Sequence, residues 1–140
     1  MRPVNSNPIT APLGSTVDPA AEAAALALSV VVIGRNEGAR LTRCLASVRR
    51  AVGSSADAEV IYVDSDSTDD SRELAAASGA TVLRVRPARP CAAIGRNAGW
   101  RAACGDFILF LDGDTILDPR FLPLALAAMD EPRVAVAWGH

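Results

Sequence analysis

Two carboxylates stand one residue apart at the end of an apolar run in the stretch FILFLDGDTIL, residues 107–117. Asp112 and Asp114 repel each other unless a positive charge lies close to both. Hard cations such as Mg²⁺ and Mn²⁺ bind carboxylate oxygens and keep open positions for water and substrate phosphates. The Asp-Gly-Asp sequence therefore predicts a divalent cation bound to Asp114 and Asp112 and shared with a diphosphate, whose charge the cation would stabilise as it leaves.

Polar clusters also follow three earlier apolar runs. Residues 34–37 follow LSVVVI, residues 64–67 follow AEVIYV, and residues 84–86 complete the third run. If the runs are parallel strands in the order 3-2-1-4, all four clusters lie along one rim of the sheet, where open α/β sheets bind ligands. One polar cluster would mean little, because loops are polar and helix N-termini favour Asp and Ser. Four clusters in register favour a binding site.

The elements that would position these clusters alternate between strand and helix, which predicts a doubly wound, mostly parallel α/β sheet. Continuous apolar runs predict buried strands at 28–33, 58–63, 80–85, 106–111 and 133–138. Helices are expected at 37–52, 67–78, 91–104 and 119–130, with Ser67 capping the second and Pro119 opening the last. Residues 1–26 read as a disordered or partly helical lead-in, and residues 27–140 as one domain that is truncated at its C-terminal end.

Composition excludes some classes of function. The net charge of −2 argues against a nucleic-acid binder with a broad basic surface. The first residues lack a signal-peptide pattern and the longest apolar stretch is too short for a bilayer, which predicts a cytoplasmic protein, with contact at the inner membrane face left open. Three cysteines without CxxC spacing are expected to be small buried residues in a reducing compartment. Trp100 is expected in the core.

Three segments together resemble glycosyltransferase family 2, inverting enzymes of the GT-A fold that use nucleotide-diphosphate sugars. LSVVVIGRNEGARLTRCLASV resembles the opening strand and helix of the family. EVIYVDSDSTDDSRELA resembles its VVDDGSTDGT segment, and AAIGRNAGWRAACGDFILFLDGDT resembles its GAARNAGLRAARGDYVLFLDAD. The resemblance covers about residues 28 to 138 in the family's order and spacing, which makes it more specific than any single motif.

The resemblance implies a domain that binds a nucleotide-diphosphate sugar with Mg²⁺ or Mn²⁺. The acceptor (a polysaccharide, a lipid or a protein glycan) is left open. Base and ribose would lie against Asp64, Asn36 and Glu37, and a helix would present Arg96 and Asn97 to the nucleotide. The full implied set for the nucleotide is Asn36, Glu37, Asp64, Asp66, Arg96, Asn97 and Asp112, with Asp114 and Asp112 for the metal. The family's general base has no counterpart in these residues, so activity of the chain alone is not implied.

Departures from the family pattern leave the base of the nucleotide open. Arg35 stands where an aromatic residue is common, Ser65 replaces the second acid of VDD, and Asp66 replaces a glycine. A non-catalytic nucleotide-binding remnant is one alternative function.

A haloacid-dehalogenase-type phosphatase is another alternative, because ILFLDGDTIL resembles its signature, in which the first Asp is a nucleophile. That signature has a glycine after its second Asp and opens its domain, whereas here three β/α units come first. GRNEGAR is a poor match to the Gly-rich basic loop of a nucleotidyltransferase, and G-x-G-x-x-G is missing after the first strand.

Overall fold

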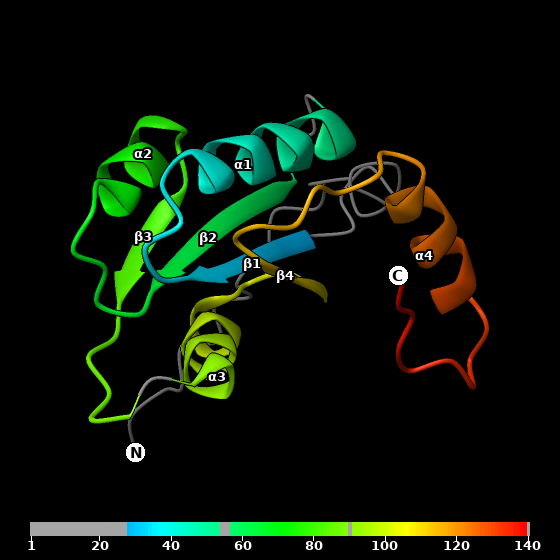
Figure 1. Ribbon diagram of the computed structural model, residues 1–140. Coiled ribbons are helices and arrows are strands. Elements are labelled where there is room, and N and C mark those ends of the chain that lie inside the picture. Colours follow the sequence, from blue (N-terminus) through cyan, green and yellow to red (C-terminus); the bar gives the residue numbers. More distant parts are fainter. Residues whose placement is uncertain (1–27, 54–56, 90, 140) are drawn as a thin grey trace, which may run out of the picture.

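The computed structural model describes residues 28–53, 57–89 and 91–139. Helices and strands alternate along the chain, as predicted (Figure 1). The bounds are β1 (Leu28–Gly34), α1 (Ala39–Val52), β2 (Ala58–Asp64), α2 (Ser71–Ala77), β3 (Thr81–Arg84), α3 (Ala92–Ala102), β4 (Phe107–Asp112) and α4 (Phe121–Met129).

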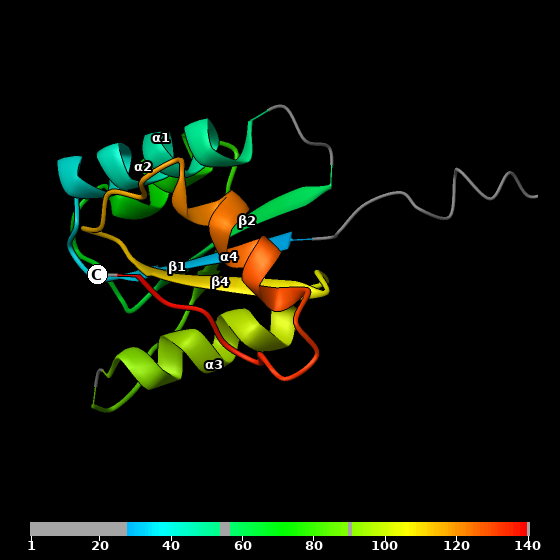
Figure 2. The ribbon, with the colours of Figure 1, turned by 90° about the vertical axis from the view of Figure 1, so that its right-hand side faces the viewer.

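The strands form one parallel sheet in the order β3-β2-β1-β4, which confirms the predicted topology. Helices α1 and α2 cover one face of the sheet and α3 covers the other (Figure 2). Alternate residues of the central strand β1 supply both cores, because side chains along a strand point to opposite faces. Val30 and Val32 belong to the core under α1, while Val31 and Ile33 belong to the core on the α3 side.

Helix α1 packs through an apolar stripe at helical spacing, formed by Leu41, Cys44, Leu45 and Val48, all of them buried. Helix α3 packs differently, through glycines. A Cβ built on Gly99 would lie 2.2 Å from Val31 Cγ1, and one on Gly95 would lie 3.2 Å from Ile33 Cγ2. The backbone of α3 therefore lies directly on β1.

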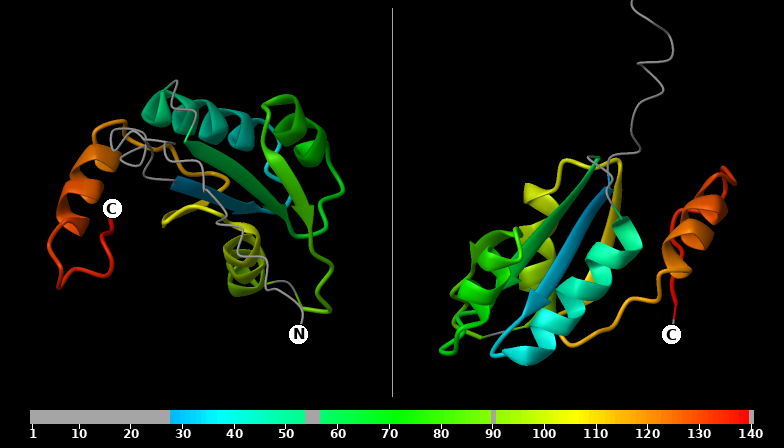
Figure 3. Two further views of the ribbon diagram at one scale, coloured as in Figure 1. Left: turned by 180° about the vertical axis from the view of Figure 1, so that it is seen from behind. Right: turned by 90° about the horizontal axis from the view of Figure 1, so that it is seen from above.

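Residues 133–138, predicted as a fifth strand, are not a strand in the structure. They follow α4 as irregular chain beside β4, where Trp138 is 82% exposed. Their apolar composition matches a strand, but composition does not supply the neighbouring strand that a ladder needs. Figure 3 shows α4 and this segment on the β4 side of the sheet, far from β3.

Three predicted helix starts are at least two residues too early, and the first of these helices, α1, begins at Ala39 and not at residue 37. Helix α2 begins at Ser71 and not at Ser67, because the Ser67 hydroxyl accepts a hydrogen bond from the β1 loop instead of capping the helix. Helix α4 begins at Phe121, after Asp118 has accepted a hydrogen bond from the Arg120 N–H at 2.9 Å. Ser67 thus binds the N–H of Asn36 in the loop after β1, whereas Asp118 binds an N–H just before its own helix.

Predictions about single residues had mixed outcomes. Cys44 is buried as expected, but Cys91 and Cys104 are exposed, and all three are free thiols. Trp100 is 59% exposed, not in the core, because its neighbour Gly99 occupies the contact with the sheet. Within the described ranges no helix is long and apolar enough to span a bilayer. The predicted lead-in, residues 1–26, lies outside the described residues.

Candidate functional site

The carboxyl ends of the four strands meet at one rim, and the register brings their last residues side by side. Gly34 pairs with Asp64, Asp64 with Arg84, and Ile33 with Asp112. Backbone hydrogen bonds carry the alignment into the loops: Ser65 N donates to Gly34 O at 2.9 Å and Val85 N donates to Asp64 O at 2.9 Å. The predicted gathering of the polar clusters at one rim is therefore what the structure shows.

A cavity of about 370 Å³ opens at this rim. It is lined by residues from the ends of β1, β2 and β4 and from the start of α3, namely Ile33, Gly34, Glu37, Ser65, Cys91, Ala92, Asp112 and Asp114. Three of the predicted site residues, all carboxylates, are in this set. Ser65 and Cys91 were not predicted as site residues. Ser65 lies inside the polar cluster after the second strand, which was the signal available for it, whereas nothing in the spacing of Cys91 pointed to the rim.

The Asp-Gly-Asp turn is fixed to its neighbours through its backbone. Gly113 N donates to Ile33 O at 2.7 Å, Thr115 N donates to Asp112 O at 2.9 Å, and the Cys44 thiol donates to the same Asp112 O at 3.7 Å. A Cβ on Gly113 would lie 3.0 Å from Glu37 Cγ, so the turn fits closely against the β1 loop. The carboxylates of Asp112 and Asp114 nevertheless remain exposed. The turn thus combines a fixed backbone with accessible acids.

The charges around this turn are negative. Burial raises the pKa of the Cys44 thiol to about 11, with further contributions from the negative charges of Asp114, Glu37 and Asp112. The same three carboxylates line one cavity. Glu37 Oε2 forms an ion pair with Arg40 Nε at 3.0 Å, yet it is buried and accepts no hydrogen bond. Such a cluster favours a cation at its centre.

The carboxylate oxygens at the rim suit a hard cation whose remaining ligands are waters or substrate phosphates. In the part of the chain that the structure describes, no three His, Cys, Asp or Glu residues are arranged to hold a metal ion by themselves. Asp112 and Asp114 offer oxygen ligands from a fixed turn. Mg²⁺ is commonly held by one or two carboxylates, with waters and substrate phosphates completing its shell. The residues present therefore fit the predicted divalent cation.

Helix α3 brings a positive charge to the same turn. Arg96 Nη2 donates to Asp112 Oδ1 at 2.7 Å, and both side chains are about half exposed, at 40% and 55%. Asn97, the next residue of α3, is exposed. The structure thus places Arg96 beside one of the two predicted metal ligands.

Asp64, predicted to line the base pocket, is fully buried beneath the loops. Its carboxylate accepts hydrogen bonds from Ser67 N at 2.9 Å, from Arg72 Nη1 at 3.3 Å and from the Tyr62 hydroxyl at 3.4 Å. Burial raises the pKa of Tyr62, and the negative charge of Asp64 raises it further. All of these partners belong to the protein, so the contacts of Asp64 hold the loop after β2 in place.

Asn36 joins the loop after β1 to the loop after β2. Its N–H donates to Ser67 Oγ at 2.9 Å, and its Oδ1 accepts from Thr68 N at 2.8 Å. The backbone of Asn36 is left-handed, with φ 55°, a conformation that Asn tolerates better than most residues. The Ser71 hydroxyl adds two more links, because it accepts from the N–H groups of Glu37 and Gly38, both at 3.0 Å.

Asp66 is the half-exposed acid of the second cluster. It also has a left-handed backbone, with φ 63°, and its Oδ1 accepts from Arg84 Nε at 2.9 Å and lies 3.4 Å from Arg86 Nε. The hydrogen bond from Arg84 lowers the pKa of Asp66, and the charges of both arginines act in the same direction. Asp66 and Asn36 therefore lie on the rim loops but do not line the cavity.

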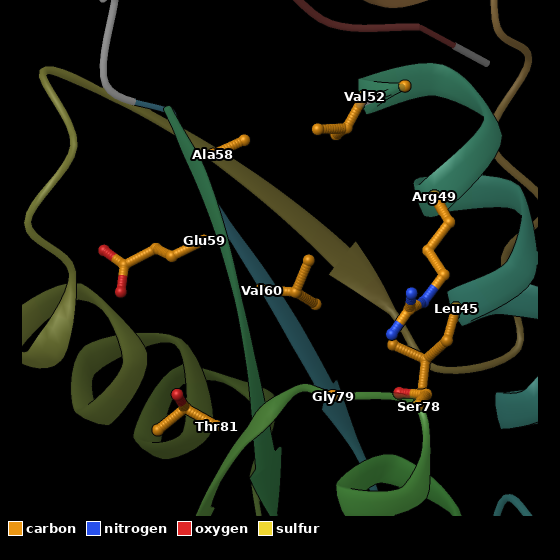
Figure 4. A pocket seen from close by; sticks show the side chains of 10 residues that line it. Leu45, Arg49, Val52, Ala58, Glu59, Val60, Ser78, Gly79 and Thr81 are labelled. Carbon is orange, nitrogen blue, oxygen red and sulfur yellow. The ribbon is translucent and has the colours of Figure 1, made fainter. Parts of the chain in front are cut away.

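A second cavity, of about 280 Å³, lies at the opposite end of the sheet (Figure 4). Arg49 points toward Ser78 and Gly79 there, while Glu59 points away from it. The Glu59 carboxylate is already bound, because it accepts from Ser29 Oγ at 2.5 Å and from Cys104 N at 2.7 Å. Among the residues that the structure describes at this end of the sheet, no acid pair on a turn is comparable to Asp112 and Asp114.

Comparison with known proteins identifies the family. The family described as glycosyl transferase family 2 matches residues 29–140, so the chain belongs to this family. This confirms the resemblance seen in the sequence and argues against the haloacid-dehalogenase alternative.

Among curated relatives, the glucosyl-3-phosphoglycerate synthase of Mycobacterium tuberculosis is 37% identical over 103 residues, which is 69% of this chain and 32% of the relative. An uncharacterized glycosyltransferase of Rickettsia felis is 38% identical over 88 residues, 62% of this chain and 28% of its own length. The chain thus spans about a third of the length of the curated relatives that it matches.

Solved structures support the GT-A fold. The M. tuberculosis glucosyl-3-phosphoglycerate synthase in complex with Mn²⁺, UDP and glucosyl-3-phosphoglycerate has a TM-score of 0.62 and 30% identity, covering 73% of this chain and 39% of the other. S. aureus TarS, 1-349, has a TM-score of 0.67 and 27% identity, covering 74% of this chain and 32% of the other. A mannosyltransferase of Pyrobaculum calidifontis, PcManGT, has a TM-score of 0.69 at 22% identity, which shows the fold alone.

Proposed function

We propose that the rim of this sheet binds the diphosphate of a nucleotide-sugar donor through a divalent cation held by Asp112 and Asp114. The observation that carries the proposal is the Asp-Gly-Asp turn, whose backbone is bound to β1 through Gly113 N and Ile33 O while both carboxylates stay exposed at the cavity. When bound there, the cation would stabilise negative charge on a departing diphosphate.

Other rim residues would have distinct parts in donor binding. Ser65 lines the cavity with a hydroxyl that can donate to or accept from a base or a sugar. Asp64 would act indirectly, because its internal hydrogen bonds fix the loop that carries Ser65. Asn36 would hold the first loop against the second. Asn97, which is exposed, and Asp66, which is half-exposed, would contact the nucleotide from outside the cavity.

The nucleotide is proposed to be a uridine diphosphate. Two relatives with solved structures, glucosyl-3-phosphoglycerate synthase and TarS, are recorded with UDP, and their identities to this chain are 30% and 27%. The whole protein is proposed to transfer the sugar to an acceptor. The cytoplasmic location and the contact with the inner face of the membrane stay predictions.

Calorimetric titration of the 140-residue chain tests the proposal. UDP, GDP and TDP are added with and without Mn²⁺ to the wild type, to Asp114→Asn and to Asp106→Asn. Asp106 is an exposed acid just before β4, at the other end of the same strand, so its variant removes an equal charge away from the rim. We expect Mn²⁺-dependent UDP binding that Asp114→Asn weakens at least about tenfold, because a charged ligand is lost, and that Asp106→Asn leaves unchanged.

The proposal fails if no nucleoside diphosphate binds in a metal-dependent way, or if the two variants behave alike. Metal-dependent UDP binding by a longer natural protein that transfers no sugar from any donor would favour the non-catalytic nucleotide-binding alternative.

A further inference from the structure

Arg96 contacts a carboxylate that the proposed function assigns to the metal. Its Nη2 lies 2.7 Å from Asp112 Oδ1, across the gap between α3 and the end of β4. We propose that Arg96 competes with the divalent cation for Asp112 and is released from it by the diphosphate, which makes metal and nucleotide binding mutually dependent. Arg96 is then a positioning residue for the metal site, and this inference rests on the proposed function.

The contact follows from the packing of α3 and β4. Gly95 and Gly99 hold the helix backbone against β1, which fixes the position of Arg96. On β4, Leu111 packs in the core under α1 and Ile108 packs on the α3 side. Because alternate residues of a strand share a face, Asp112 is directed to the α3 side, the side of Arg96. The ion pair therefore joins two side chains that the fold directs toward each other.

Pairing with arginine distinguishes the two proposed metal ligands, Asp112 and Asp114, from each other. Glu37 pairs with Arg40, Asp64 with Arg72, and Asp66 with Arg84 and Arg86. Asp114 has no arginine ion pair among the residues that the structure describes. Of the two proposed metal ligands, one is thus accessible to a cation and the other is bound to an arginine.

The charges explain why the two ligands would be coupled. A guanidinium at 2.7 Å covers one carboxylate oxygen of Asp112 and repels a cation approaching it. Arginine also binds phosphate oxygens strongly and in a bidentate manner, so a diphosphate offers Arg96 a better partner than one carboxylate oxygen. Once Arg96 moves to the diphosphate, Asp112 is available to the metal. Each ligand then raises the affinity for the other by the same factor.

The test measures Mn²⁺ binding without nucleotide, by the electron paramagnetic resonance signal of free Mn²⁺, on the whole 140-residue chain. The variants are Arg96→Gln, Arg96→Lys and Arg101→Gln. Arg101 is an exposed arginine in the last turn of the same helix, so its variant controls for the loss of one positive charge from α3. We expect Arg96→Gln to bind Mn²⁺ about two- to fivefold more tightly, as breaking a half-exposed ion pair allows.

The same variant should bind UDP less tightly in the presence of Mn²⁺, and the effect of UDP on Mn²⁺ affinity should shrink. Arg96→Lys should lie between wild type and Arg96→Gln, and Arg101→Gln should match the wild type. A variant that merely loosened the site would weaken Mn²⁺ binding, so a gain in affinity separates competition from a structural effect.

The inference is overturned if Arg96→Gln binds Mn²⁺ no more tightly than Arg101→Gln while the wild type still shows metal-dependent UDP binding. That result would leave the proposed function intact. If the wild type binds neither Mn²⁺ nor UDP, both proposals fail together. Circular dichroism of each variant confirms that it is folded before its affinity is compared.

Discussion

Two regions of the molecule, strands β1 and β2 on the one hand and β4 with α4 on the other, differ in how completely they are buried. On the β1–β2 side, Val30, Val31 and Val32 are fully buried, and side-chain hydrogen bonds link the loops after the two strands. On the β4–α4 side, Phe110 is 40% exposed and Leu124 is 70% exposed. The loops proposed to hold the nucleotide therefore rest on a complete core, whereas the turn proposed to bind the metal follows a partly covered edge strand.

This difference explains why the Asp-Gly-Asp turn is bound to β1 and α1 and not to α4. The hydrogen bonds of its backbone to other elements run to Ile33 and Cys44, both on the well-covered side. The turn thereby gains a fixed position that its own strand does not provide. If the β1–β2 side is the more completely buried, substitutions there should lower the free energy of unfolding much more than similar substitutions on the β4–α4 side.

The largest expected effect is that of Asp64→Ala. The change leaves Arg72 without its ion-pair partner and Ser67 N without an acceptor in a buried place. Removing one partner of a buried, hydrogen-bonded charge should lower the free energy of unfolding by about 2–4 kcal/mol. Urea denaturation measures this, with Asp130→Ala at the end of α4 as the control, where the change should stay below about 0.5 kcal/mol. Equal losses in the two variants would contradict the comparison.

A smaller effect is expected for Gly99→Ala. The new Cβ would lie 2.2 Å from Val31 Cγ1, so α3 must move away from β1. Overpacking of this kind should cost about 1–3 kcal/mol of unfolding free energy. The double variant Gly99→Ala, Val31→Ala should recover part of that loss, because the clashing methyl group is gone. Thermal or urea unfolding of both single variants and the double variant gives the coupling free energy between the two positions. If the losses of the single variants simply add in the double variant, the clash with Val31 is not the cause of the loss at Gly99.

The sequence predicted the bounds of the well-buried strands β1 and β2 closely, for a physical reason. Strands β1 and β2 are buried on both faces, so they are continuous apolar runs, and their bounds were close to those observed. Residues 133–138 carry a similar run but lack a strand partner, which composition cannot reveal. The start of α2 was placed at Ser67 because a sequence does not show whether a hydroxyl binds its own helix or a neighbouring loop.

The strand ends predicted to carry the site lie at one rim, while the individual residues at those ends differ in their surroundings. Asp64 and Ser65 are adjacent, yet one is buried and the other lines the cavity. Strand alternation accounts for the difference, because Asp64 shares the face of Tyr62, which packs under α1. The pairing of Arg96 with Asp112 depends on how closely α3 approaches β1, which no local pattern gives.

On the β4–α4 side, Leu124→Gln should change the unfolding free energy by less than about 0.5 kcal/mol, because the side chain is already 70% exposed. The matched change on the covered side, Leu45→Gln in α1, places an amide where a leucine is 3% exposed and should cost several times more. Urea denaturation of the two variants measures both losses of unfolding free energy, which can then be compared. A loss at Leu124 similar to that at Leu45 would mean that α4 packs as tightly as α1.

The smallest effect concerns Asp118, just before α4. Hydrogen bonds from the Arg120 side chain and backbone lower the pKa of Asp118 to about 2 from its ordinary value of 3.8. A carboxyl whose pKa is lower in the folded state adds stability above the unfolded pKa and loses it as the pH falls through the folded value. The small stability difference between wild type and Asp118→Asn should therefore be constant above about pH 5 and decline toward pH 2.

Unfolding by urea at several pH values between 5 and 2 measures that difference. Because Asp118 is a surface residue on the partly covered side, the difference should also fall with added salt. A decline that began above pH 5 would be too early for the lowered pKa of Asp118. It would mean that the loss of stability in acid depends on a carboxyl group other than Asp118.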